Sequence, residues 1–530
     1  MELVAAQRLA PPPSTAAPST VAPSTVAPST AAPSSSSSST GAAPSRPLLK
    51  RRGTNLGLLL LHTESHTNRS IPAFYFTLDG DLTLAAFRER VANSLGRLER
   101  FRSAMRDDTF VDDGSFSVDD HVTELTEAEL GGRPTEQTLR QWLEDNFTAA
   151  LDERKPLWQM RIIRHYRFDG KEATSAQTVV IARLHHVIVD GTAGMKMLAT
   201  MTDEYAAGSL TSEPAQKASR DAVARVETAA RAKVKWGAVG TAFGVGSVLC
   251  KYAADCLRKE PETPFRGCTT SARSIAWAML DASASLETAR AHGCTLNDLW
   301  MSALATSMGG YLRAAGRATE GLEVTVGMPV SLHPPILPAN VGNSIGNNFG
   351  FLTAQLPLSA VKGSAVKGSH GDDRSEAEVR LKAIRQRMEV AKARPEALVS
   401  HGLAVCSGCL PTPAVKCALA SAGNARASTI VSNVRGPPEA LHLDGKKLSS
   451  LYGFLPTPPG VALGVGIGTY AGRLCVSVCC DRGLLGDDSH ELLRRMLDEH
   501  ASLCATAATR IASANGNVTP TVPANATAAA

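Results

Sequence analysis

The sequence contains no run of 18 or more strongly apolar residues, so it predicts no membrane-spanning helix. The nearest segment, Trp236–Cys250, carries no charge, but it is 15 residues long and includes four glycines. These properties favour a segment that is buried or lies at an interface over one that spans a bilayer.

Charge of one sign is also lacking, since a net charge of +5 is spread over 530 residues. This excess is too weak to indicate nucleic-acid binding, and we expect no nucleic-acid partner. A mildly basic surface tolerates anionic lipid or a nucleotide phosphate without requiring either. Hydrophobic residues make up 43% and charged residues 20%, which is ordinary for a globular protein.

The eleven cysteines have no regular spacing, which favours small buried side chains in a reducing, intracellular compartment. The segment from Cys406 to Cys409 is a lone CxxC motif. A zinc site needs two further ligands at matching spacing, and none follows nearby. The sequence therefore predicts no metal site.

Both ends of the chain have low-complexity composition. Residues 1–48 are rich in Ala, Pro, Ser and Thr, cannot bury a core and are predicted to be disordered. They have no apolar h-region, so we expect no secretory signal, whereas the scarcity of acidic residues leaves an organelle transit peptide open. Residues 506–530 are predicted to form a flexible tail. The tandem repeat over Ser359–Ser369 indicates a surface loop.

Between the tails, apolar periodicity predicts two lobes, at residues 49–208 and 271–505, joined by a partly helical crossover at 209–270. Strands and helices alternate in both lobes, which indicates an α/β (α+β) two-layer architecture. Helices are predicted at Leu84–Phe101, Leu139–Leu151, Thr192–Tyr205, Leu296–Leu312 and Glu376–Ala393. Strands are predicted at Ala73–Leu78, Met160–Ile163, Thr178–Leu184, Leu322–Pro329 and Phe349–Leu356, and repeatedly between Ser428 and Asp481.

The segment with the clearest chemistry follows the strand Thr178–Leu184. His185 and His186 lie at the strand end, and Asp190 and Gly191 mark the turn before the next helix. A histidine at a strand end can project into a cleft, and its ordinary pKa of about 6.5 suits proton transfer near neutral pH. Gly191 permits a positive φ or a close backbone approach.

Two other interpretations of this histidine pair stay open at this point. A buried histidine is often a hydrogen-bonded core residue without a chemical role. A His-His pair before an aspartate can also bind metal, but adjacent strand residues point to opposite faces and are poorly placed to hold one ion.

The pattern His-His-x-x-x-Asp-Gly resembles the signature of the CoA-dependent acyltransferase and condensation-domain superfamily. Within it, the chain resembles the bacterial-type wax ester synthase/diacylglycerol acyltransferase family over residues 55–505. Further matching blocks occur in order along the chain: Phe116–Val122, Leu151-Asp152 through Pro156-Leu157-Trp158, Leu296-Asn297-Asp298, Met328–Leu332, Gly342-Asn343, Asn347–Gly350, Ser432–Pro437, and Ala462–Tyr470 with the following Ala471-Gly472.

There are also departures from this pattern. The family usually has Pro where Arg435 stands and Arg where His333 stands, and Gln159 replaces a common acidic residue. The first two departures leave the shape of the acyl or acceptor channel in doubt.

The resemblance implies a two-lobed sandwich with the active site in a channel between the lobes. It implies transfer of a fatty acyl group from acyl-CoA, as co-substrate without another cofactor, to a diacylglycerol or long-chain fatty alcohol. His186 is the implied general base, and Asn297 is the implied oxyanion donor. His185 is expected to pack or orient, and Asp190 to hold the loop.

Two more residues of these blocks have a structural interpretation. Asp298 has the spacing of a helix capping box with Thr295. Trp158 is expected to pack near the channel or in the core.

Other acyltransferase classes fit less well. A plant-type acyltransferase would carry Asp-Phe-Gly-Trp-Gly late in the chain, and this motif is absent. A condensation domain normally lies beside carrier domains, for which the chain has no room. An acyltransferase with another alcohol acceptor, or a non-catalytic lipid-surface binding protein, remains as an alternative. The apolar substrates lead us to expect peripheral attachment to the endoplasmic reticulum, another membrane or a lipid droplet.

Overall fold

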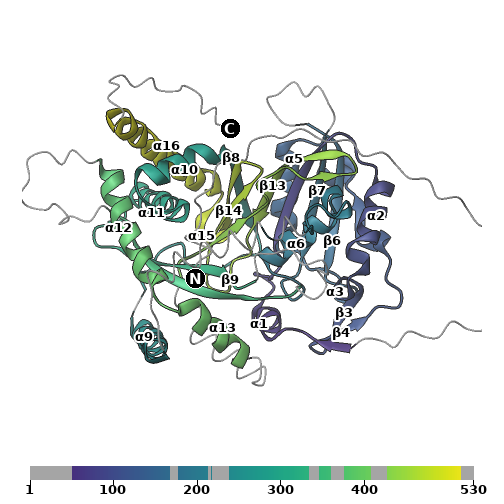
Figure 1. Ribbon diagram of the computed structural model, residues 1–530, viewed down its shortest axis with the longest axis horizontal. Coiled ribbons are helices and arrows are strands. Elements are labelled where there is room, and N and C mark those ends of the chain that lie inside the picture. The colour runs from purple at the N-terminus through teal and green to yellow at the C-terminus, as the bar shows by residue number, and fades with distance from the viewer. Residues whose placement is uncertain are drawn as a thin grey trace, which may run out of the picture.

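The computed structural model describes residues 50–167, 177–212, 217, 238–258, 260–333, 345–359, 375–407 and 427–514. In this part of the chain, two six-stranded sheets and a small three-stranded sheet carry the fold, with helices against them. Figure 1 shows the strands of the first large sheet on the right, beside α2, α5 and α6, and α10, α11, α12 and α16 on the left. The mixed α/β architecture with two sheet-rich lobes was predicted and is confirmed.

The first large sheet has β7 near its centre, flanked by the antiparallel neighbours β2 and β6. Seven of the eight residues of β7 are buried, which explains its nearly continuous apolar sequence. The sheet order is β12 (His442–Leu443), β13 (Lys446–Phe454), β2 (Ala73–Asp79), β7 (Gln177–Leu184), β6 (Trp158–Tyr166) and β5 (Val122–Glu124).

The second large sheet is mixed, because β11 runs parallel to both β9 and β14 while the other neighbours are antiparallel. Its order is β10 (Phe349–Pro357), β9 (Glu323–Ser331), β11 (Thr429–Arg435), β14 (Leu463–Tyr470), β15 (Arg473–Asp481) and β8 (Arg273–Asp281). The small sheet joins β1 (Lys50–Arg52), β4 (Thr109–Asp112) and β3 (Ser103–Arg106).

Two strands of the predicted second lobe, β12 and β13, lie in the first large sheet. β13 comes from the predicted second lobe, but it pairs with β2 of the first sheet, with Tyr452 opposite Tyr75. The first large sheet therefore includes strands from residues 442–454 as well as from the first half of the chain. Strand pairing alone does not place the boundaries at residues 208 and 271, which stay a prediction.

The described helices of the first half have at most 11 residues, whereas α9, α11, α12 and α16 of the second half have 17 or more. The first half has α1 (Asn55–Thr63), α2 (Leu84–Asn93), η1 (Leu95–Arg97), α3 (Glu99–Arg102), η2 (Val118–Asp120), α4 (Glu127–Leu130), α5 (Glu136–Asn146), α6 (Gly191–Thr200) and α7 (Asp203–Ala206). The second half has α9 (Ala238–Leu257), α10 (Ala282–Ala291), α11 (Leu296–Ala314), α12 (Glu376–Lys392), α13 (Glu396–Ser407), α15 (Arg482–Leu485) and α16 (Ser489–Ala514). No helix within these ranges is both long and apolar enough to cross a membrane.

A shared hydrophobic core joins the two halves. Tyr75 of β2 packs edge-on against Trp277 of β8, with ring centroids 5.7 Å apart, and stacks on Tyr452 of β13 at 4.7 Å. Burying aromatic rings from both sheets in one cluster fixes the sheets against each other. The strand end that carries the histidine pair is thereby held close to the second half.

Two predicted helices are interrupted in the structure. The helix predicted at Leu84–Phe101 ends at Asn93, because the Ser94 hydroxyl bonds back to the carbonyl of Arg90 and the Ser94 backbone leaves the helical region. The helix predicted at Thr192–Tyr205 is divided at Thr202, whose side chain caps a separate short helix, α7. Apolar periodicity continues across both breaks, which is why it did not reveal them.

The C-terminal tail begins later than predicted. Residues 506–514 continue α16, so the flexible tail predicted from residue 506 is wrong for this stretch. Ala507 is 2% exposed, and Arg510 pairs with Glu378 of α12 at 2.8 Å. Small alanines in a low-complexity composition thus still form a packed helix. The predicted disorder of residues 1–48 lies outside the described residues, as do nearly all of the predicted surface loop at Ser359–Ser369 and Cys409 of the CxxC motif.

Candidate active site

The histidine segment is a tight turn between β7 and α6. The His185 amide donates to the carbonyl of Leu157 at 2.9 Å, and the His186 amide donates to the carbonyl of Ser70 at 2.8 Å. The Ile188 amide then closes the turn onto the carbonyl of His185 at 3.0 Å. Three backbone bonds therefore fix the direction in which each imidazole leaves the chain.

His186 has the geometry of a neutral base. Its Nδ1 lies 3.2 Å from the carbonyl oxygen of Val189, so Nδ1 carries the proton and donates it to that oxygen. This tautomer leaves the lone pair on Nε2. Burial lowers the pKa of His186 to about 4, although the charge of Asp190 opposes that effect. The ring is therefore unprotonated near neutral pH, the state that a general base requires.

His185 has the opposite tautomer and a full set of partners. Its Nδ1 accepts from the Val187 amide at 2.9 Å, so Nε2 carries the proton and donates it to Glu64 at 3.1 Å. The residue is 2% exposed. Both ring nitrogens are occupied, and the contacts fit the orienting role expected for His185 and leave no lone pair for a substrate.

Glu64 supports the turn from outside the motif. Its carboxylate accepts hydrogen bonds from His185 and, at 2.9 Å, from the Ser70 amide. The carbonyl oxygen of Ser70 in turn accepts a hydrogen bond from the His186 amide. Burial would raise the pKa of Glu64, but the bonds from His185 and Ser70 outweigh this effect and hold the pKa below its ordinary value. Nothing in the sequence motif indicated this residue, because it lies 121 positions from His185.

Asp190 holds the start of α6 to the second half of the protein. One carboxylate oxygen caps α6 by accepting from the Ala193 amide at 2.9 Å. The other accepts from the Asn348 amide at 2.8 Å and from Nε2 of His333 at 2.7 Å. Its contacts are those expected of a residue that holds the loop.

Gly191 does not have a positive φ, so an unusual backbone angle is not the reason for glycine here. A Cβ added there would lie 3.4 Å from a methyl group of Val434 in β11, which is ordinary van der Waals contact, so the residue borders β11 without requiring glycine for space. The end of β11 belongs to the Ser432–Pro437 block. Two of the matching blocks therefore meet at the first residue of α6.

Two further side chains bind the carbonyl oxygens of the turn. Nδ2 of Asn347 donates to the carbonyl of His186 at 2.6 Å, and Arg100 donates to the carbonyl of Ile188 at 3.2 Å. Burial lowers the pKa of Arg100 to about 10, which still leaves it charged near neutral pH. The Asn347–Gly350 block had drawn attention to Asn347 from the sequence alone, whereas no sequence motif pointed to Arg100.

Asn297 and Asp298 begin α11, and both are 3% exposed. The predicted capping box is confirmed: Asp298 accepts from the Thr295 amide, and Thr295 accepts from the Asp298 amide. Asp298 also pairs with Lys392 at 2.8 Å. Nδ2 of Asn297 is buried and has no hydrogen-bond partner among the described residues, so it is a donor without an acceptor.

Trp158 is a core residue that backs the turn. It is 2% exposed, its indole nitrogen donates to the carbonyl of Phe101 at 2.8 Å, and its ring stacks on His121 at 4.4 Å. The expected core packing is thereby seen. The carbonyl oxygen of the neighbouring Leu157 accepts a hydrogen bond from the His185 amide, so the Pro156-Leu157-Trp158 block positions the histidine pair.

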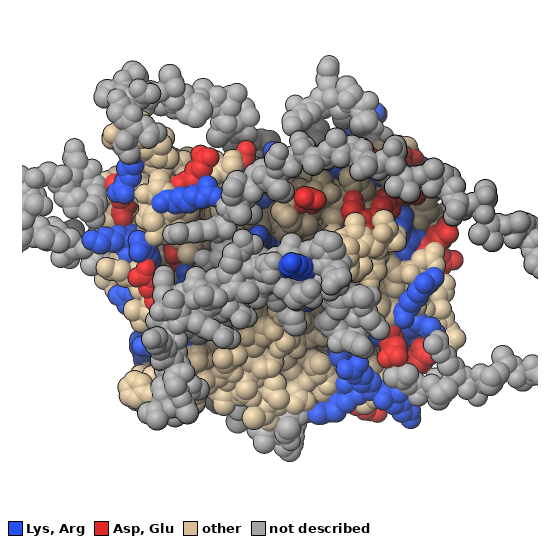
Figure 2. Space-filling model, viewed as in Figure 1, with Lys and Arg blue, Asp and Glu red and all other residues tan. Residues whose placement is uncertain are grey.

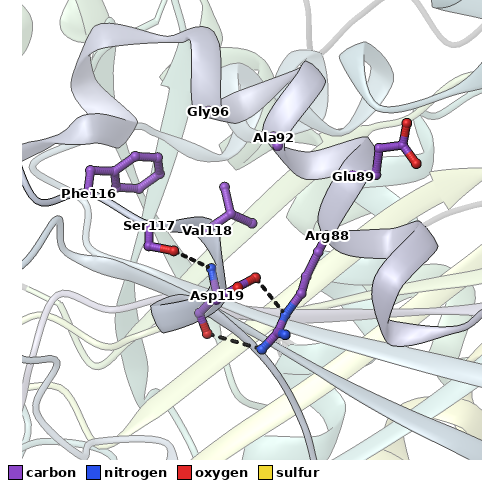
Figure 3. A pocket seen from close by; sticks show the side chains of 8 residues that line it. All are labelled: Arg88, Glu89, Ala92, Gly96, Phe116, Ser117, Val118 and Asp119. Carbon is purple, nitrogen blue, oxygen red and sulfur yellow. Dashed lines mark hydrogen bonds and ion pairs between the residues drawn. The ribbon is translucent and has the colours of Figure 1, made fainter.

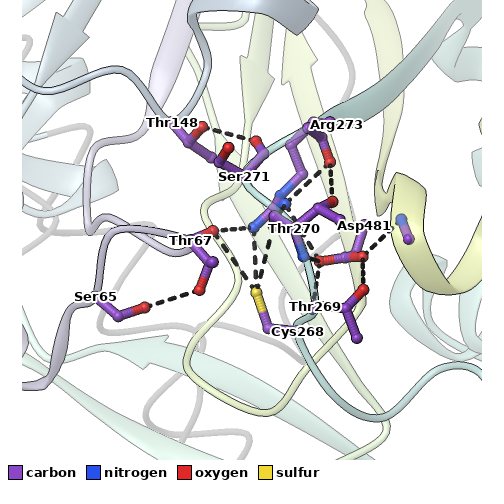
Figure 4. A network of polar contacts seen from close by, with 11 residues as sticks. Ser65, Thr67, Thr148, Cys268, Thr269, Thr270, Ser271, Arg273 and Asp481 are labelled. Carbon is purple, nitrogen blue, oxygen red and sulfur yellow. Dashed lines mark hydrogen bonds and ion pairs between the residues drawn. The ribbon is translucent and has the colours of Figure 1, made fainter.

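A buried polar network fastens the loop that carries Glu64 and Ser70. Arg273 donates to the carbonyl of Thr67 in this loop at 2.7 Å and pairs with Asp481 at 3.4 Å (Figure 4). Asp481 also accepts from the amides of Thr269 and Thr270. The side chains of Arg273 and Asp481 are 2% and 1% exposed, so the second half of the protein holds this loop through an interior contact.

The described pockets lie away from the histidine turn. One is a shallow hollow at the surface between α2 and η2, lined by Arg88, Phe116 and Asp119 among others (Figure 3). Another is lined by residues of β13 and β15 and their neighbours. Neither contains His185 or His186, and the predicted channel stays a prediction. No group of three metal-binding side chains is found in the ranges that the structure covers.

Comparison with known proteins gives consistent matches. The family model "Wax ester synthase/diacylglycerol acyltransferase catalytic domain" matches residues 58–300, and "WS/DGAT C-terminal domain" matches residues 345–503. Two Mycobacterium tuberculosis proteins, each named "probable diacylglycerol O-acyltransferase", are both 24% identical to this chain. One alignment covers 79% of this chain and 88% of tgs1, and the other covers 71% of this chain and 77% of Tgs4.

Solved structures show the same fold at lower identity. The wax ester synthase/diacylglycerol acyltransferase from Marinobacter aquaeolei VT8 has a TM-score of 0.56 and 16% identity, over 86% of this chain and 99% of that one. The trichothecene 15-O-acetyltransferase TRI3 from Fusarium sporotrichioides has a TM-score of 0.56 and 11% identity, over 86% and 95%.

Proposed function

Because the chain belongs to the wax ester synthase/diacylglycerol acyltransferase family and is an acyl-CoA-dependent O-acyltransferase, we propose that His186 is its general base and that its acceptor is a diacylglycerol, a long-chain fatty alcohol or both. The observation that carries the assignment of the base is the tautomer of His186. Val189 binds the Nδ1 proton, and Nε2 keeps its lone pair.

In the proposed reaction, the acceptor hydroxyl lies next to Nε2 of His186. Nε2 removes the hydroxyl proton as the oxygen attacks the thioester carbonyl carbon. The tetrahedral intermediate then breaks the carbon–sulfur bond, and the departing CoA thiolate takes the proton from His186. General base catalysis typically contributes about 10²- to 10⁴-fold in rate. No covalent acyl-enzyme is needed when both substrates are bound together.

We propose Asn297 as the donor to the developing oxyanion. Its buried amide lacks a partner among the described residues, and a buried unpaired donor costs about 1–3 kcal/mol. This cost is offset if the Asn297 amide donates a hydrogen bond to a substrate oxygen in the transition state. His185, Asp190 and Gly191 would then position His186, while Asp298 and Trp158 support the surrounding fold. The proposed steps use side chains alone, so they require no metal and no cofactor beyond acyl-CoA.

We further propose that the protein works at a lipid surface inside the cell, on the endoplasmic reticulum, another membrane or a lipid droplet. Apolar side chains are exposed on two neighbouring helices: Phe243, Leu249 and Leu257 of α9, and Leu398, Leu403 and Val405 of α13. Exposed apolar groups of this size on adjacent elements are typical of interaction sites. Whether the N-terminal tail directs the chain to an organelle is open.

Charge and position support a lipid as the partner of this face. The strand β1, whose residues Lys50, Arg51 and Arg52 are all exposed, lies two residues before α1, and α1 packs on α13. In Figure 2, uncharged surface at the lower edge of the view is bordered on the right by Lys and Arg with some Asp and Glu among them, where Figure 1 places β3 and β4. Apolar area beside basic residues fits an anionic lipid surface.

The opposite side of α13 leads towards the base. His401 of α13 hydrogen-bonds to the carbonyl of Phe349 at 3.0 Å, and the Phe349 ring lies 6.4 Å from the ring of His186. The path from α13 to the histidine turn therefore runs through Phe349 at the start of β10, and this short route suits an acceptor drawn from a lipid phase.

An acyl-transfer assay tests the enzymatic proposal. Purified protein would be incubated with acyl-CoA and both acceptors together, with CoA thiol measured and lipid products separated by thin-layer chromatography. We expect thiol release with triacylglycerol, wax ester or both as products. Release no greater than that of His186→Ala would overturn the proposal and favour a non-catalytic lipid-binding protein.

A vesicle flotation assay tests the lipid-facing surface. We expect the protein to float with vesicles containing phosphatidylserine, and Leu398→Ser with Leu403→Ser to reduce the bound fraction several-fold. Ile511→Ser on α16, which Figure 1 shows on the opposite edge of the molecule, is the matched control at an exposed apolar residue. Equal flotation of both variants would contradict this surface assignment.

A further inference from the structure

A hollow between β13 and β15 combines positive charge with apolar side chains. Lys447 of β13 and Arg473 of β15 both line it, and both are exposed. Its apolar lining includes Met279, Leu448 and Ala471. The volume of the hollow is about 340 Å³, within the range of about 300–1,000 Å³ that small-molecule sites occupy. Its chemistry therefore fits a small anionic ligand that also has an apolar part.

The two cations are not neutralised by protein groups. Neither Lys447 nor Arg473 makes a hydrogen bond or an ion pair within the part of the chain that the structure describes. Asp281 lies opposite Arg473 in the strand register, but its carboxylate accepts from the amide and the hydroxyl of Ser283. Two positive charges that line one hollow repel each other, so an anion that binds between them is attracted by both.

The backbone around the hollow is held in place. Ala471 adopts a φ of 47° in the turn between β14 and β15, and its amide donates to the carbonyl of Pro437 at 2.9 Å. The pairing of β13 with β2 shifts register between Leu448 and Ser450, so a bulge places Ser449 in the lining. Bulges commonly redirect side chains beside functional sites. A ligand would therefore meet a frame that is already formed.

The hollow lies close to the start of α6, which follows the histidine turn. Val434 of β11 borders Gly191, and a Cβ added at Gly436 would lie 3.4 Å from the terminal methyl of Met195 in α6. Two residues further on, Pro438 lines the hollow. Since four residues of chain span about 14 Å at most, the edge of the hollow lies within that distance of Val434.

The hollow and the apolar face of α9 and α13 lie towards opposite edges of the second large sheet. α13 packs on β10 at one edge, whereas Arg473 and Met279 belong to β15 and β8 at the other, with β11 between them. Four strand spacings, about 19 Å, separate β10 from β15. Figure 1 shows α9 and α13 at the lower edge of the molecule and β8 and β13 in its upper half. A water-soluble substrate can thus approach from the side away from the lipid.

Of the substrates of the proposed reaction, only acyl-CoA carries phosphate groups. An arginine binds phosphate through two parallel hydrogen bonds, and a lysine binds it as a point charge. We propose that Lys447 and Arg473 bind the phosphates of acyl-CoA in this hollow, with its nucleotide against the apolar lining. The pantetheine arm then passes the end of β11 and the start of α6 to bring the thioester to His186. This inference rests on the proposed function of His186 and adds the place where the charged end of the acyl donor is held.

The test compares acyl-CoA with acyl-pantetheine, which keeps the thioester but lacks the nucleotide and its phosphates. We expect Lys447→Gln and Arg473→Gln each to raise KM for acyl-CoA about tenfold, since each removes a charge-assisted bond that is made in the ground state and the transition state alike. The preference for acyl-CoA over acyl-pantetheine, measured as the ratio of the two kcat/KM values, should fall by the same factor.

Lys446→Gln is the matched control, because this neighbouring lysine pairs with Asp444 at 3.0 Å and does not line the hollow. It should keep the wild-type preference for acyl-CoA. The proposal is overturned if Lys447→Gln and Arg473→Gln keep that preference too, or if Lys446→Gln lowers it equally.

Two binding measurements separate this inference from the enzymatic proposal, because they need no turnover. In titration calorimetry with CoA alone, the Kd should rise about tenfold in Lys447→Gln and in Arg473→Gln. A wild-type Kd in both variants would refute the site, whatever the transfer assay shows. Flotation with phosphatidylserine vesicles distinguishes a lipid phosphate from that of CoA, and both variants should float as wild type does. A several-fold loss of flotation with unchanged CoA binding would assign the hollow to lipid headgroups and overturn the proposal.

Discussion

The carbonyl oxygen of His186 accepts a hydrogen bond of 2.6 Å from the side-chain amide of Asn347, which lies 161 residues further along the chain. The bond crosses from the end of the second sheet to the turn after β7. It holds the backbone of the proposed base. Burial lowers the pKa of His186 and the side chain of Asn347 opposes that effect, so Asn347 acts on the ring as well as on the backbone.

Asn347→Ala is therefore expected to lower kcat about tenfold, because the turn loses one of the contacts that fix the ring position. Steady-state kinetics with saturating acyl-CoA would measure this effect. Asn347→Asp is the informative control, since a carboxylate is nearly isosteric but cannot donate to a carbonyl. It should be at least as slow as the alanine variant. Unchanged kcat in both variants would show that this bond is not needed for positioning.

His186→Ala is expected to reduce transfer by about 10²- to 10⁴-fold with the fold retained, since it removes the base. His185→Ala should be milder, because His185 contacts Glu64 and the Val187 amide and presents no free lone pair. Glu64→Gln should resemble His185→Ala. CoA thiol release and circular dichroism check both points, and greater sensitivity of His185 than of His186 would reverse the assigned roles.

The pH dependence of activity should reflect the low pKa of His186. Since the folded protein holds this pKa at about 4, the base stays unprotonated as the pH falls from 7 to about 5. The acid side of the kcat profile should therefore be level across this interval, unlike that of a solvent-exposed histidine with a pKa of about 6.5. A half-maximal rate near pH 6.5 on the acid side would contradict the buried state of the ring.

Stability should depend on pH in the same region. Burial lowers the pKa of both His186 and His500 to about 4, below the unfolded value of about 6.5. The unfolded chain therefore binds more protons between about pH 6.5 and 4, and the free energy of unfolding falls as the pH falls through this window. Each residue contributes up to about 3 kcal/mol to this loss.

Urea unfolding at pH 7.5 and pH 5 would measure the change. His500→Gln should reduce the pH dependence, because glutamine does not titrate there. His500 stacks on Trp300 at 4.9 Å and bonds to Ser285, away from the histidine turn, so this variant should affect stability and leave kcat unchanged. The same pH dependence in wild type and His500→Gln would contradict this prediction.

Neighbouring residues at the start of α11 should separate catalysis from stability. Asn297→Ala is expected to lower kcat by about 10²- to 10³-fold if its amide binds the oxyanion. Asp298→Asn should leave kcat near wild type but lower the free energy of unfolding by about 1 kcal/mol, since it weakens the capping box and the pair with Lys392. Kinetics and thermal unfolding of both variants test this contrast. Equal effects on kcat would argue against a specific role for Asn297.

Local sequence was enough to predict the segments on which the site is built. The apolar run at residues 178–184 predicted the buried strand β7, and the Thr295–Asp298 spacing predicted the capping box. Both features depend on interactions between residues close together in the sequence, so the order of residue types is enough to predict them. Broken helices escaped prediction, because apolar periodicity continues through Ser94 and Thr202 although single side-chain bonds end the helices there.

The sequence by itself thus determined the family resemblance, the α/β class and the turn that carries His186, since all of these depend on residue types in order along the chain. Only the tertiary structure decided which distant groups meet at that turn. Glu64, Arg100, His333 and Asn347 come from four separate segments. Their bonds set the tautomer of His185 and the position of His186, because hydrogen-bond geometry depends on distances in the folded chain and not on separation in sequence.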